Sequence, residues 1–241
     1  MKIVHVTTVA SSHRYLLLPQ LTALREAGHE VVAVSAPGPD TAALTAAGIR
    51  FVPLAGSTRG ADPVADLRAV RAFAAVVRAE RPDLVHTHNP KPGVYGRVVA
   101  RLLGVPRVVN TVHGLYATPT DPVTRRAVVY GLEAVASRCS HLELVQNAED
   151  LALMDRTLLA PRGRTRLLGN GIDVDRFRPR NDPTARRRVR AEFGLPVDAT
   201  VVVTVGRLVA EKGIGELLAA SARVGAEHHL LVVGPDDPAK G

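Results

Sequence analysis

Short apolar runs rich in valine and isoleucine alternate along the chain with segments of helical periodicity, and this alternation restricts the fold more than any other feature. Strands that alternate with helices predict a parallel sheet, because each helix returns the chain to the same end of the sheet. The runs that we expect to be strands in the first part of the chain are 2–9, 30–36, 49–54, 83–88, 107–113, 141–146 and 165–168. The sequence therefore predicts an α/β fold with a doubly wound parallel sheet.

Two of the expected helices carry boundary signals. Gly28 is a typical stop for a helix over 15–27, in which Leu17, Leu21 and Leu24 share one face. Asp62 is typical of an N-cap and Pro63 of the first helical position, which predicts a helix through residue 80. The residues of this second helix that we expect to face the sheet are Val64, Leu67, Val70 and Val77.

The composition changes after residue 168, where a stretch rich in arginine, aspartate and proline begins. Beyond it, a strand over 200–206, a helix over 213–224 and a strand over 228–233 begin a new unit. Two strands and one helix cannot cover both faces of a parallel sheet. We therefore expect a first domain over 1–169, a linker over 170–198 and the incomplete start of a second domain over 199–241.

The formal net charge is +8, and only four lysines stand among the 31 basic residues. This arginine excess reflects either genome composition or an anionic partner, such as phosphate esters, an acidic membrane surface or nucleic acid. With four Phe, four Tyr and no Trp, the chain is poorly supplied for base stacking, so we expect no nucleic-acid partner. The densest basic run suits a solvated linker helix or contact with an anionic membrane. It holds seven arginines, at 176, 178, 180, 186, 187, 188 and 190.

Cysteine content and the first residues bear on location. Cys139 is the single cysteine, so the sequence carries no disulfide framework and suits a reducing compartment. Residues 1–8 hold a short apolar run cut by His5, which resembles neither a secretory leader nor a membrane span. We therefore expect a cytoplasmic protein, peripheral at the inner face of the membrane if the basic run binds lipid. The sequence does not indicate an oligomeric state.

Polar residues gather where the expected strands end, which is where ligands bind in open parallel sheets. They include Asn147 and also His113, which precedes Gly114. The first loop lacks the glycine fingerprint of dinucleotide-binding proteins, which disfavours a hydride-transfer enzyme. The other members are Ser11, Ser12, His13 and Arg14 after the first strand, and His86, His88, Asn89 and Lys91 around the fourth.

His86 and His88 lie two apart on an expected strand and so point to the same face, a spacing that suits metal binding. No carboxylate or cysteine nearby provides an evident third ligand, so we expect no metal site. Two other interpretations stay open. The histidines are strand-end polar residues that hydrogen-bond the neighbouring backbone, or they line an acceptor site with Lys91 as an anion contact.

A cationic loop is expected between the strand at 200–206 and the helix that follows. Arg207 and Lys212 lie five apart in this loop, and Gly213 follows at the start of the helix. Two cations beside a helix N-terminus suit a diphosphate. A solvated charged loop is the alternative interpretation of the same residues.

Four segments together resemble the family 4 retaining glycosyltransferases, which have the two-domain GT-B fold. The segments are 86–93, 110–114, 170–173 with Arg176 and Phe177, and 205–213. The resemblance implies a Rossmann-like first domain and the incomplete start of a second Rossmann-like domain. It also implies a retaining hexosyltransferase of cell-envelope or exopolysaccharide assembly, which moves a sugar from a nucleotide diphosphate sugar to a sugar or lipid-linked acceptor.

The resemblance also implies roles for individual residues. Arg207 and Lys212, with Gly213, would bind the leaving diphosphate without a metal or other cofactor, and His113 would lie beside the donor sugar. In such enzymes the leaving phosphate is thought to take the acceptor's proton, so that no protein base is required. The residues that the resemblance places on the acceptor side are Ser11, Ser12, His13, Arg14, His86, His88, Asn89 and Lys91.

The chain departs from the family pattern in two places. Many members have a glycine-rich first loop, where this chain has Ser11 and Ser12. The family's paired glutamates and its closing C-terminal helix would lie beyond residue 241, so we expect a C-terminally truncated chain that does not turn over sugar by itself. A noncatalytic acceptor-binding module and a sugar-nucleotide epimerase of the same architecture are the alternatives. The loop at 207–212 favours a transferase over an epimerase.

Overall fold

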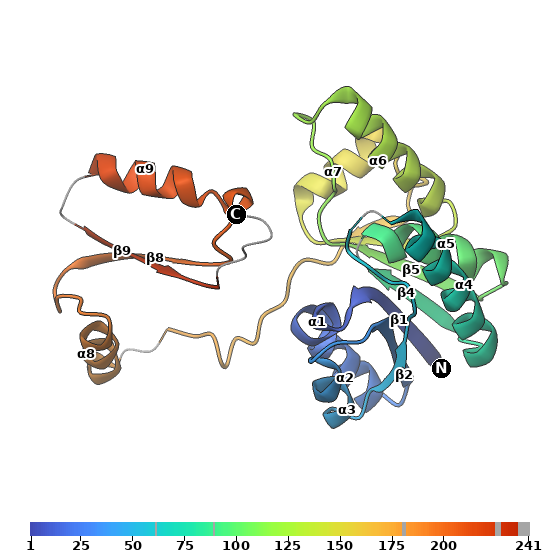
Figure 1. The fold of residues 1–241 in the computed structure, drawn as a ribbon, viewed down its shortest axis with the longest axis horizontal. Coiled ribbons are helices and arrows are strands. Elements are labelled where there is room, and N and C mark those ends of the chain that lie inside the picture. The colour runs from blue at the N-terminus through green and yellow to red at the C-terminus, as the bar shows by residue number, and fades with distance from the viewer. Residues whose placement is uncertain (61, 89, 180–181, 225–227, 236–241) are drawn as a thin grey trace. The chain divides into compact units, whose positions relative to one another are not determined.

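The computed structural model describes residues 1–60, 62–88, 90–179, 182–224 and 228–235. The chain divides into two compact units, Met1–Gly171 and Ile172–Gly241 (Figure 1). The boundary between them falls inside the stretch 170–198 that the sequence predicts as a linker. Each unit has its own sheet.

The first unit is built on a seven-stranded sheet with the order β3-β2-β1-β4-β5-β6-β7. Every neighbouring pair is parallel. The order reverses between β1 and β4, which lie side by side at the centre of the sheet. The doubly wound sheet predicted from the sequence is thus confirmed. The strands are β1 (Lys2–Val9), β2 (Glu30–Ala36), β3 (Arg50–Pro53), β4 (Leu84–His88), β5 (Arg107–Val112), β6 (Leu142–Val145) and β7 (Thr165–Leu167).

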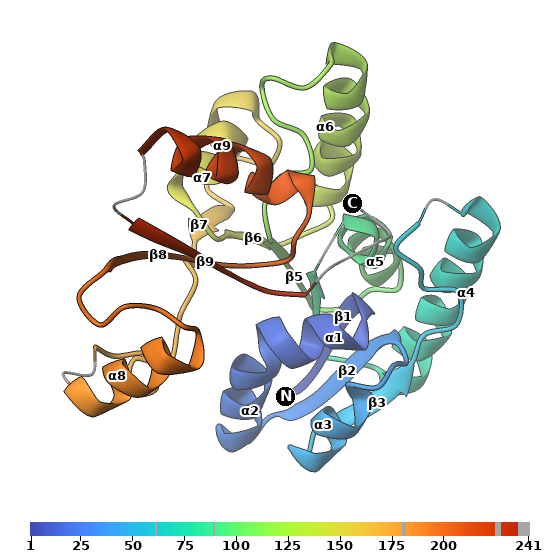
Figure 2. The same ribbon diagram turned by 60° about the vertical axis from the view of Figure 1, so that its left-hand side comes forward.

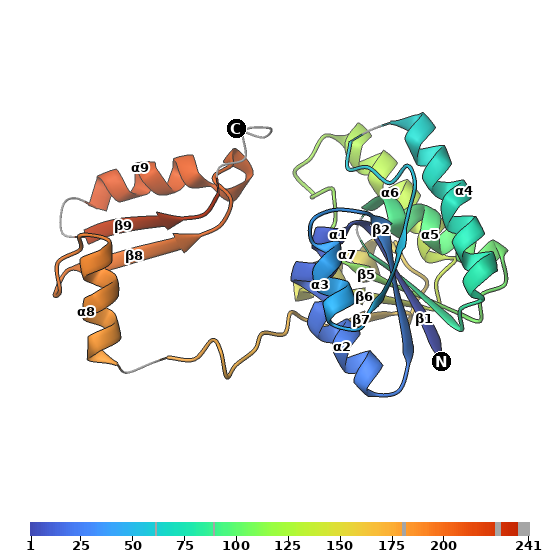
Figure 3. The same ribbon diagram turned by 60° about the horizontal axis from the view of Figure 1, so that its bottom comes forward.

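Helices cover both faces of this sheet, as parallel strands require. Helices α2 (Leu18–Glu26) and α3 (Thr41–Ala46) pack on one face of β2 and β3 through a cluster that includes Leu21 and Leu44. Figure 3 shows α2 and α3 on the opposite side of the sheet from α4 and α5. The helices of that second face are α4 (Pro63–Glu80), α5 (Pro90–Leu102), α6 (Val123–Ser137) and α7 (Ala148–Thr157).

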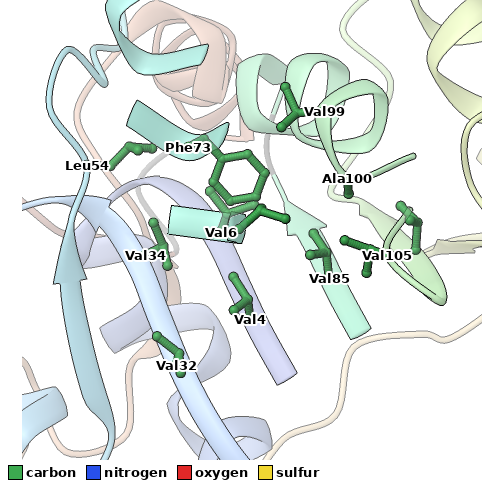
Figure 4. Close-up of a cluster of buried hydrophobic side chains, with 12 residues drawn as sticks. Val4, Val6, Val32, Val34, Leu54, Phe73, Val85, Val99, Ala100 and Val105 are labelled. Carbon is green, nitrogen blue, oxygen red and sulfur yellow. The ribbon is translucent and has the colours of Figure 1, made fainter. Parts of the chain in front are cut away.

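The largest core lies between the central strands and helices α4 and α5. Phe73 of α4 is fully buried and points among valines of β1, β2 and β4 (Figure 4). Branched side chains suit this layer because they fill the pleated surface of a sheet that is buried on both faces. The members labelled in Figure 4 are Val4, Val6, Val32, Val34, Leu54, Phe73, Val85, Val99, Ala100 and Val105.

Helix α4 has the predicted ends, but its buried face agrees only in part with the predicted one. Val77 is buried and Val70 packs partly buried against the core, as predicted. The Asp62 side chain accepts a hydrogen bond from the Ala65 backbone N–H at 3.0 Å, which confirms the N-cap. Val64 and Leu67, however, are 69% and 49% exposed, so the prediction that they face the sheet is wrong. The buried residues of this helix are Ala65, Ala69, Phe73 and Val77. Alanines on this face let the helix approach the sheet closely, and Phe73 fills the space between them.

The chain turns into a helix directly after β1, earlier than predicted. Helix α1 (Ala10–Ser12) continues into a π-type turn over His13–Leu17 and then into α2. The prediction of a loop at Ser11–Arg14 is therefore wrong. Val9, at the N-cap of α1, forms no side-chain capping bond, so the sequence carried no start signal there. Of the three leucines predicted to share a face, Leu17 and Leu21 are buried and Leu24 packs partly buried against the same cluster.

The second unit contains the elements predicted for it. Strands β8 (Thr200–Val205) and β9 (His228–Val233) pair in parallel, and α9 (Ile214–Val224) connects them. Figure 2 shows β8 and β9 side by side, with α9 along them. Helix α8 (Pro183–Glu192) begins at Asp182, whose side chain accepts hydrogen bonds from the backbone N–H groups of Thr184 and Ala185.

Candidate functional site

A cluster of histidines lies at the centre of the first sheet, on the strands where the order reverses. His5 of β1 pairs in register with His86 of β4, and His88 follows two residues later. Because side chains alternate along a strand, all three lie on the face opposite Val85 and Thr87. His113 follows the end of β5, two residues beyond Thr111, which pairs with His88. The fold therefore brings together two histidines that the sequence analysis singled out as a pair and two from other strands.

The imidazoles contact one another directly. His5 Nδ1 lies 3.1 Å from His88 Nε2, and His88 Nδ1 lies 3.1 Å from His113 Nε2. The ring centroids of His86 and His88 are 4.1 Å apart, and His86 Nε2 lies 2.8 Å from the Thr111 hydroxyl oxygen. The interpretation that His86 and His88 hydrogen-bond the neighbouring backbone is thus wrong, because side chains from adjacent strands are their partners.

Burial keeps these rings neutral. It lowers the pKa of His86 to about 3, and it holds the pKa values of His5 and His88 well below the usual range for histidine, with the neighbouring histidines adding to the effect. Burial also lowers the pKa of His113, although a hydrogen bond with the Gln146 side chain opposes this shift. A charged imidazole loses its hydration when it is buried, which favours the neutral form of each ring.

The sequence analysis missed His5 as a functional candidate. Within the part of the chain that the structure describes, His5, His86 and His88 form the group whose geometry suits a metal ion, with one ligand atom from each within 4.8 Å of the others. His5 of the neighbouring strand thus offers a third nitrogen beside the pair that the sequence pointed to. The signal was a histidine in the first strand, which becomes informative only once β1 is paired with β4.

Three residues predicted to line an acceptor site are buried. His13 is fully buried, and its Nε2 lies 3.2 Å from the Val34 carbonyl oxygen. His86 and His88 are buried at 5% and 1% exposure. These three side chains therefore contribute little to the exposed surface, and their place on the acceptor side stays a prediction. The π-type turn directs His13 toward the sheet. The alternation of side chains along β4 places His86 and His88 together on one buried face of the sheet.

The remaining acceptor-side candidates lie near the carboxyl ends of β1 and β4, with Asn89 outside the described residues. Arg14 is exposed, whereas Ser11 and Ser12 are half-buried. The Ser11 hydroxyl accepts a hydrogen bond from Arg59 at 3.4 Å. Lys91 pairs with Asp66 of α4 at 2.5 Å, which neutralises part of the charge that we predicted as an anion contact.

A small cavity lies beside His113. Its volume is about 30 Å³, and its lining includes His113, Gly114, Arg97 and Glu133. A cavity of this size holds a water molecule or a single small polar group. Gly114 has a φ of +101°, a conformation that glycine adopts readily and other residues rarely do. The backbone after β5 therefore makes its turn at a glycine, at the edge of this cavity.

A buried ion-pair network forms one wall of that cavity. Arg97 of α5 lies 2.7 Å from Glu133 of α6 and 2.8 Å from Glu143 of β6, and the Asn110 amide donates to Glu143 at 2.7 Å. Burial raises the pKa of Glu143, whereas the charge of Arg97 opposes this shift. These residues come from four separate segments, and nothing in their local sequence indicated that they would meet.

The predicted cationic loop of the second unit follows β8. Arg207 lies just after the strand, and a 3-10 turn over Ala210–Lys212 leads through Gly213, with a φ of +68°, into α9. A Cβ at Gly234, after β9, would lie 1.7 Å from the Gly206 carbonyl oxygen. The backbones that follow β8 and β9 are thus in close contact, which holds the start of the Arg207 loop.

Comparison with known proteins identifies the family of the chain. The model of the Glycosyl transferase 4-like family matches residues 2–139. The chain belongs to this family. It is 31% identical over 155 residues to the UDP-Gal:alpha-D-GlcNAc-diphosphoundecaprenol alpha-1,3-galactosyltransferase of Escherichia coli, a match that covers 64% of this chain and 39% of the relative. The match thus spans about two fifths of that relative's length.

Solved structures of glycosyltransferases share the family fold. The chain resembles the sucrose-phosphate synthase of Thermosynechococcus elongatus with a TM-score of 0.77 and 23% identity, covering 100% of this chain and 64% of that one. It resembles HepE of Anabaena, solved with UDP and glucose, with a TM-score of 0.76 and 20% identity, covering 98% and 62%. Similarity at this level of identity concerns the fold. No helix among the described residues is both long and apolar enough to cross a membrane.

Proposed function

We propose that this protein transfers a sugar from a nucleotide diphosphate sugar to a sugar or lipid-linked acceptor, in the assembly of a cell-envelope or exported polysaccharide. Membership of the Glycosyl transferase 4-like family supports a transferase. The printed name of the Escherichia coli relative gives a UDP-linked donor and a diphosphoundecaprenol-linked acceptor for that protein. The resemblance to HepE, which was solved with UDP, supports a nucleotide donor.

The observation that carries the proposal furthest is the loop between β8 and α9. It brings Arg207, Lys212 and Gly213 to the carboxyl end of a parallel strand, directly before a helix of eleven residues. Cations and a helix N-terminus stabilise negative charge as it develops on a leaving group. In this proposal they bind the departing diphosphate, and no metal or other cofactor is required.

The proposal gives His113 a place beside the donor sugar and places Ser11, Ser12, Arg14 and Lys91 on the acceptor side. It also includes retention of the anomeric configuration. The leaving phosphate then accepts the proton of the acceptor hydroxyl, so that no carboxylate of the protein acts as a base. Burial lowers the pKa values of His5 and His88, which makes these enclosed imidazoles weak bases and unsuited to that task as well.

Calorimetry with UDP and with GDP tests the donor site. In any form of the protein that contains the second unit, we expect Arg207→Ala and Lys212→Ala each to weaken diphosphate binding by about 1.5 to 3 kcal/mol, because each removes a charge-assisted contact. This corresponds to roughly 10- to 150-fold in affinity. Arg223→Ala, in the last turn of α9, removes the same charge at the far end of the helix and should have little effect. Unchanged affinity in both loop variants would remove the assignment.

We further propose that the arginine-rich stretch at 176–190 contacts an anionic membrane surface, where a lipid-linked acceptor would lie. Helix α8 supports this proposal because Arg186, Arg187 and Arg188 are all exposed on it. Arg190 is committed in part to the protein, since it donates a hydrogen bond to the Ala199 carbonyl at 2.8 Å. In this proposal the protein is cytoplasmic and peripheral at the inner face of the membrane.

A further inference from the structure

Three of the four clustered histidines lie on a diagonal across the sheet. From His5 the next strand presents His86 in register and His88 two residues further on, and from His88 the next strand presents Thr111 in register and His113 two residues beyond it. Each step therefore moves one strand over and two residues toward the carboxyl edge. Long side chains at such diagonal positions can reach one another. Both contacts along this line are 3.1 Å.

A neutral imidazole has one nitrogen that donates and one that accepts. Both nitrogens of His88 are engaged, Nε2 with His5 and Nδ1 with His113. If one of these nitrogens donates, the other must accept, so the two contacts run in the same direction. The three rings thus have two arrangements, in which all protons point toward His113 or all point toward His5.

The inner end of the diagonal decides between these arrangements. His5 Nε2 is buried and has no hydrogen-bond partner among the residues that the structure describes. With the protons directed toward His5, this nitrogen would carry an N–H buried without an acceptor. With the protons directed toward His113, it carries only a lone pair. Unpartnered buried N–H groups are rarer in proteins than unpartnered acceptors, so the second arrangement is favoured.

We propose that His88 and His5 are positioning residues that fix His113 in the tautomer with its proton on Nδ1. His5 Nδ1–H donates to His88 Nε2, and His88 Nδ1–H donates to His113 Nε2. The His113 Nδ1–H is then directed to an acceptor at the rim of the sheet, either the Gln146 side chain or an oxygen of a bound sugar. Only this link to the donor sugar rests on the proposed function.

The arrangement explains why histidines occupy buried positions where apolar residues would fill the space. A free neutral histidine exchanges between tautomers, whereas a hydrogen-bonded one is held in the tautomer that its partner accepts. A fixed N–H distinguishes a ligand with an oxygen acceptor from one with a donor at the same place. His86, whose ring is tilted against that of His88 and hydrogen-bonded to Thr111, packs against the side of this line.

Nitrogen NMR of the 241-residue chain, labelled with ¹⁵N-histidine, tests the inference at pH 7. We expect the parent to show His113 in a single tautomer, with Nδ1 protonated and Nε2 bare. His88→Leu removes the donor, and the His113 signals should move toward a mixture of tautomers. His88→Asn should restore the parent pattern, since its amide N–H lies near the position of Nδ1. A merely structural role for His88 would not predict this rescue.

His5→Leu provides a second variant, because its effect on His113 must pass through His88. We expect the same loss of the single tautomer there. Phe73→Leu weakens the core on the opposite face of the sheet and should leave the His113 signals unchanged.

A His113 pattern that stays the same in both His88→Leu and His5→Leu would overturn the inference. So would stoichiometric binding of added Zn²⁺ to the parent that shifts the signals of His5, His86 and His88, since these residues would then be metal ligands. No nucleotide is present in these samples, so their outcome does not depend on UDP binding in the second unit. A failure of this inference can therefore be distinguished from a failure of the proposed function.

Discussion

At the scale of single residues, the first unit contains several buried histidines that are neutral. Five of its histidines have lowered pKa values, with burial as the first cause for each. A lowered folded-state pKa means that the unfolded chain binds more protons below the ordinary histidine pKa. The free energy of unfolding therefore falls as the pH falls below about 6.5, and the loss continues down to the folded-state pKa.

His13 allows this effect to be measured at one residue, because burial lowers its pKa to about 4. Between pH 6 and pH 5, His13 alone should contribute about 1.2 kcal/mol per pH unit to the slope of the unfolding free energy. We expect His13→Leu to flatten the slope by that amount in urea denaturation series at half-unit intervals. Leu21→Ala, in the adjoining helix, should lower stability without changing the slope. An unaltered slope in His13→Leu would show that His13 is already charged in the folded chain.

At the scale of elements, α5 packs unusually close to the sheet. A Cβ built at Gly96 would lie 2.8 Å from Thr87 Cγ2 and 3.5 Å from Val6 Cγ1. Thr87 has little freedom to give way, because its hydroxyl donates to the Asn110 side chain at 2.7 Å. Since Pro90 of this helix and His88 of β4 are close in sequence, the same contact sets where the carboxyl end of β4 lies.

We expect Gly96→Ala to lower the free energy of unfolding by about 1 to 3 kcal/mol, because the added methyl group overpacks the interface between helix and sheet. Gly131→Ala in α6 is the matched substitution, since a Cβ there meets nothing within 4 Å. It should raise stability by about 0.5 to 1 kcal/mol through helix propensity. Thermal and urea unfolding of the two variants give the comparison. Equal effects would mean that α5 lies further from the sheet than described.

The elements also show which parts of the structure a single sequence can predict. Runs of branched apolar residues predicted the strands, and Asp62 with Pro63 predicted the start of α4. Helix α3 is six residues long and its N-cap, Asp40, forms no side-chain capping bond, so it left little signal. The start of α7 was missed because Asn147 was interpreted as a strand-end polar group, whereas its side chain accepts from the Asp150 backbone N–H at 2.6 Å. The histidine cluster needed the register between β1, β4 and β5, which no local pattern contains.

At the scale of the whole molecule, the basic residues behind the net charge of +8 differ in their surroundings between the two units. In the first unit, Arg97 pairs with two glutamates and Lys91 pairs with Asp66. Helix α8 of the second unit instead has a run of arginines and no buried residue among its members. The positive charge of α8 thus faces solvent, where an anionic surface can reach it.

Sedimentation with vesicles of anionic and of neutral lipid tests the membrane proposal. We expect binding to anionic vesicles at low salt, weakened at physiological salt by screening. Arg187→Gln with Arg188→Gln should reduce it by about 2 kcal/mol, since each surface cation adds about 1 kcal/mol. The matched control, Arg71→Gln with Arg78→Gln on α4, removes the same charge from the first unit and should reduce binding less. No sedimentation with anionic vesicles at either salt concentration would exclude a membrane role for this stretch.

The alternation of side chains in β4 also limits how the gene can change in length. Val85 and Thr87 face the apolar core, whereas His86 and His88 face the other side of the sheet. Inserting or deleting one codon within this strand would exchange the two sets, because the side-chain period of a strand is two residues. Such a change would bury imidazoles against Phe73 and break both contacts of the diagonal at once. A substitution in β4 changes one side chain at a time, whereas a change in length moves every side chain that follows it to the other face of the sheet.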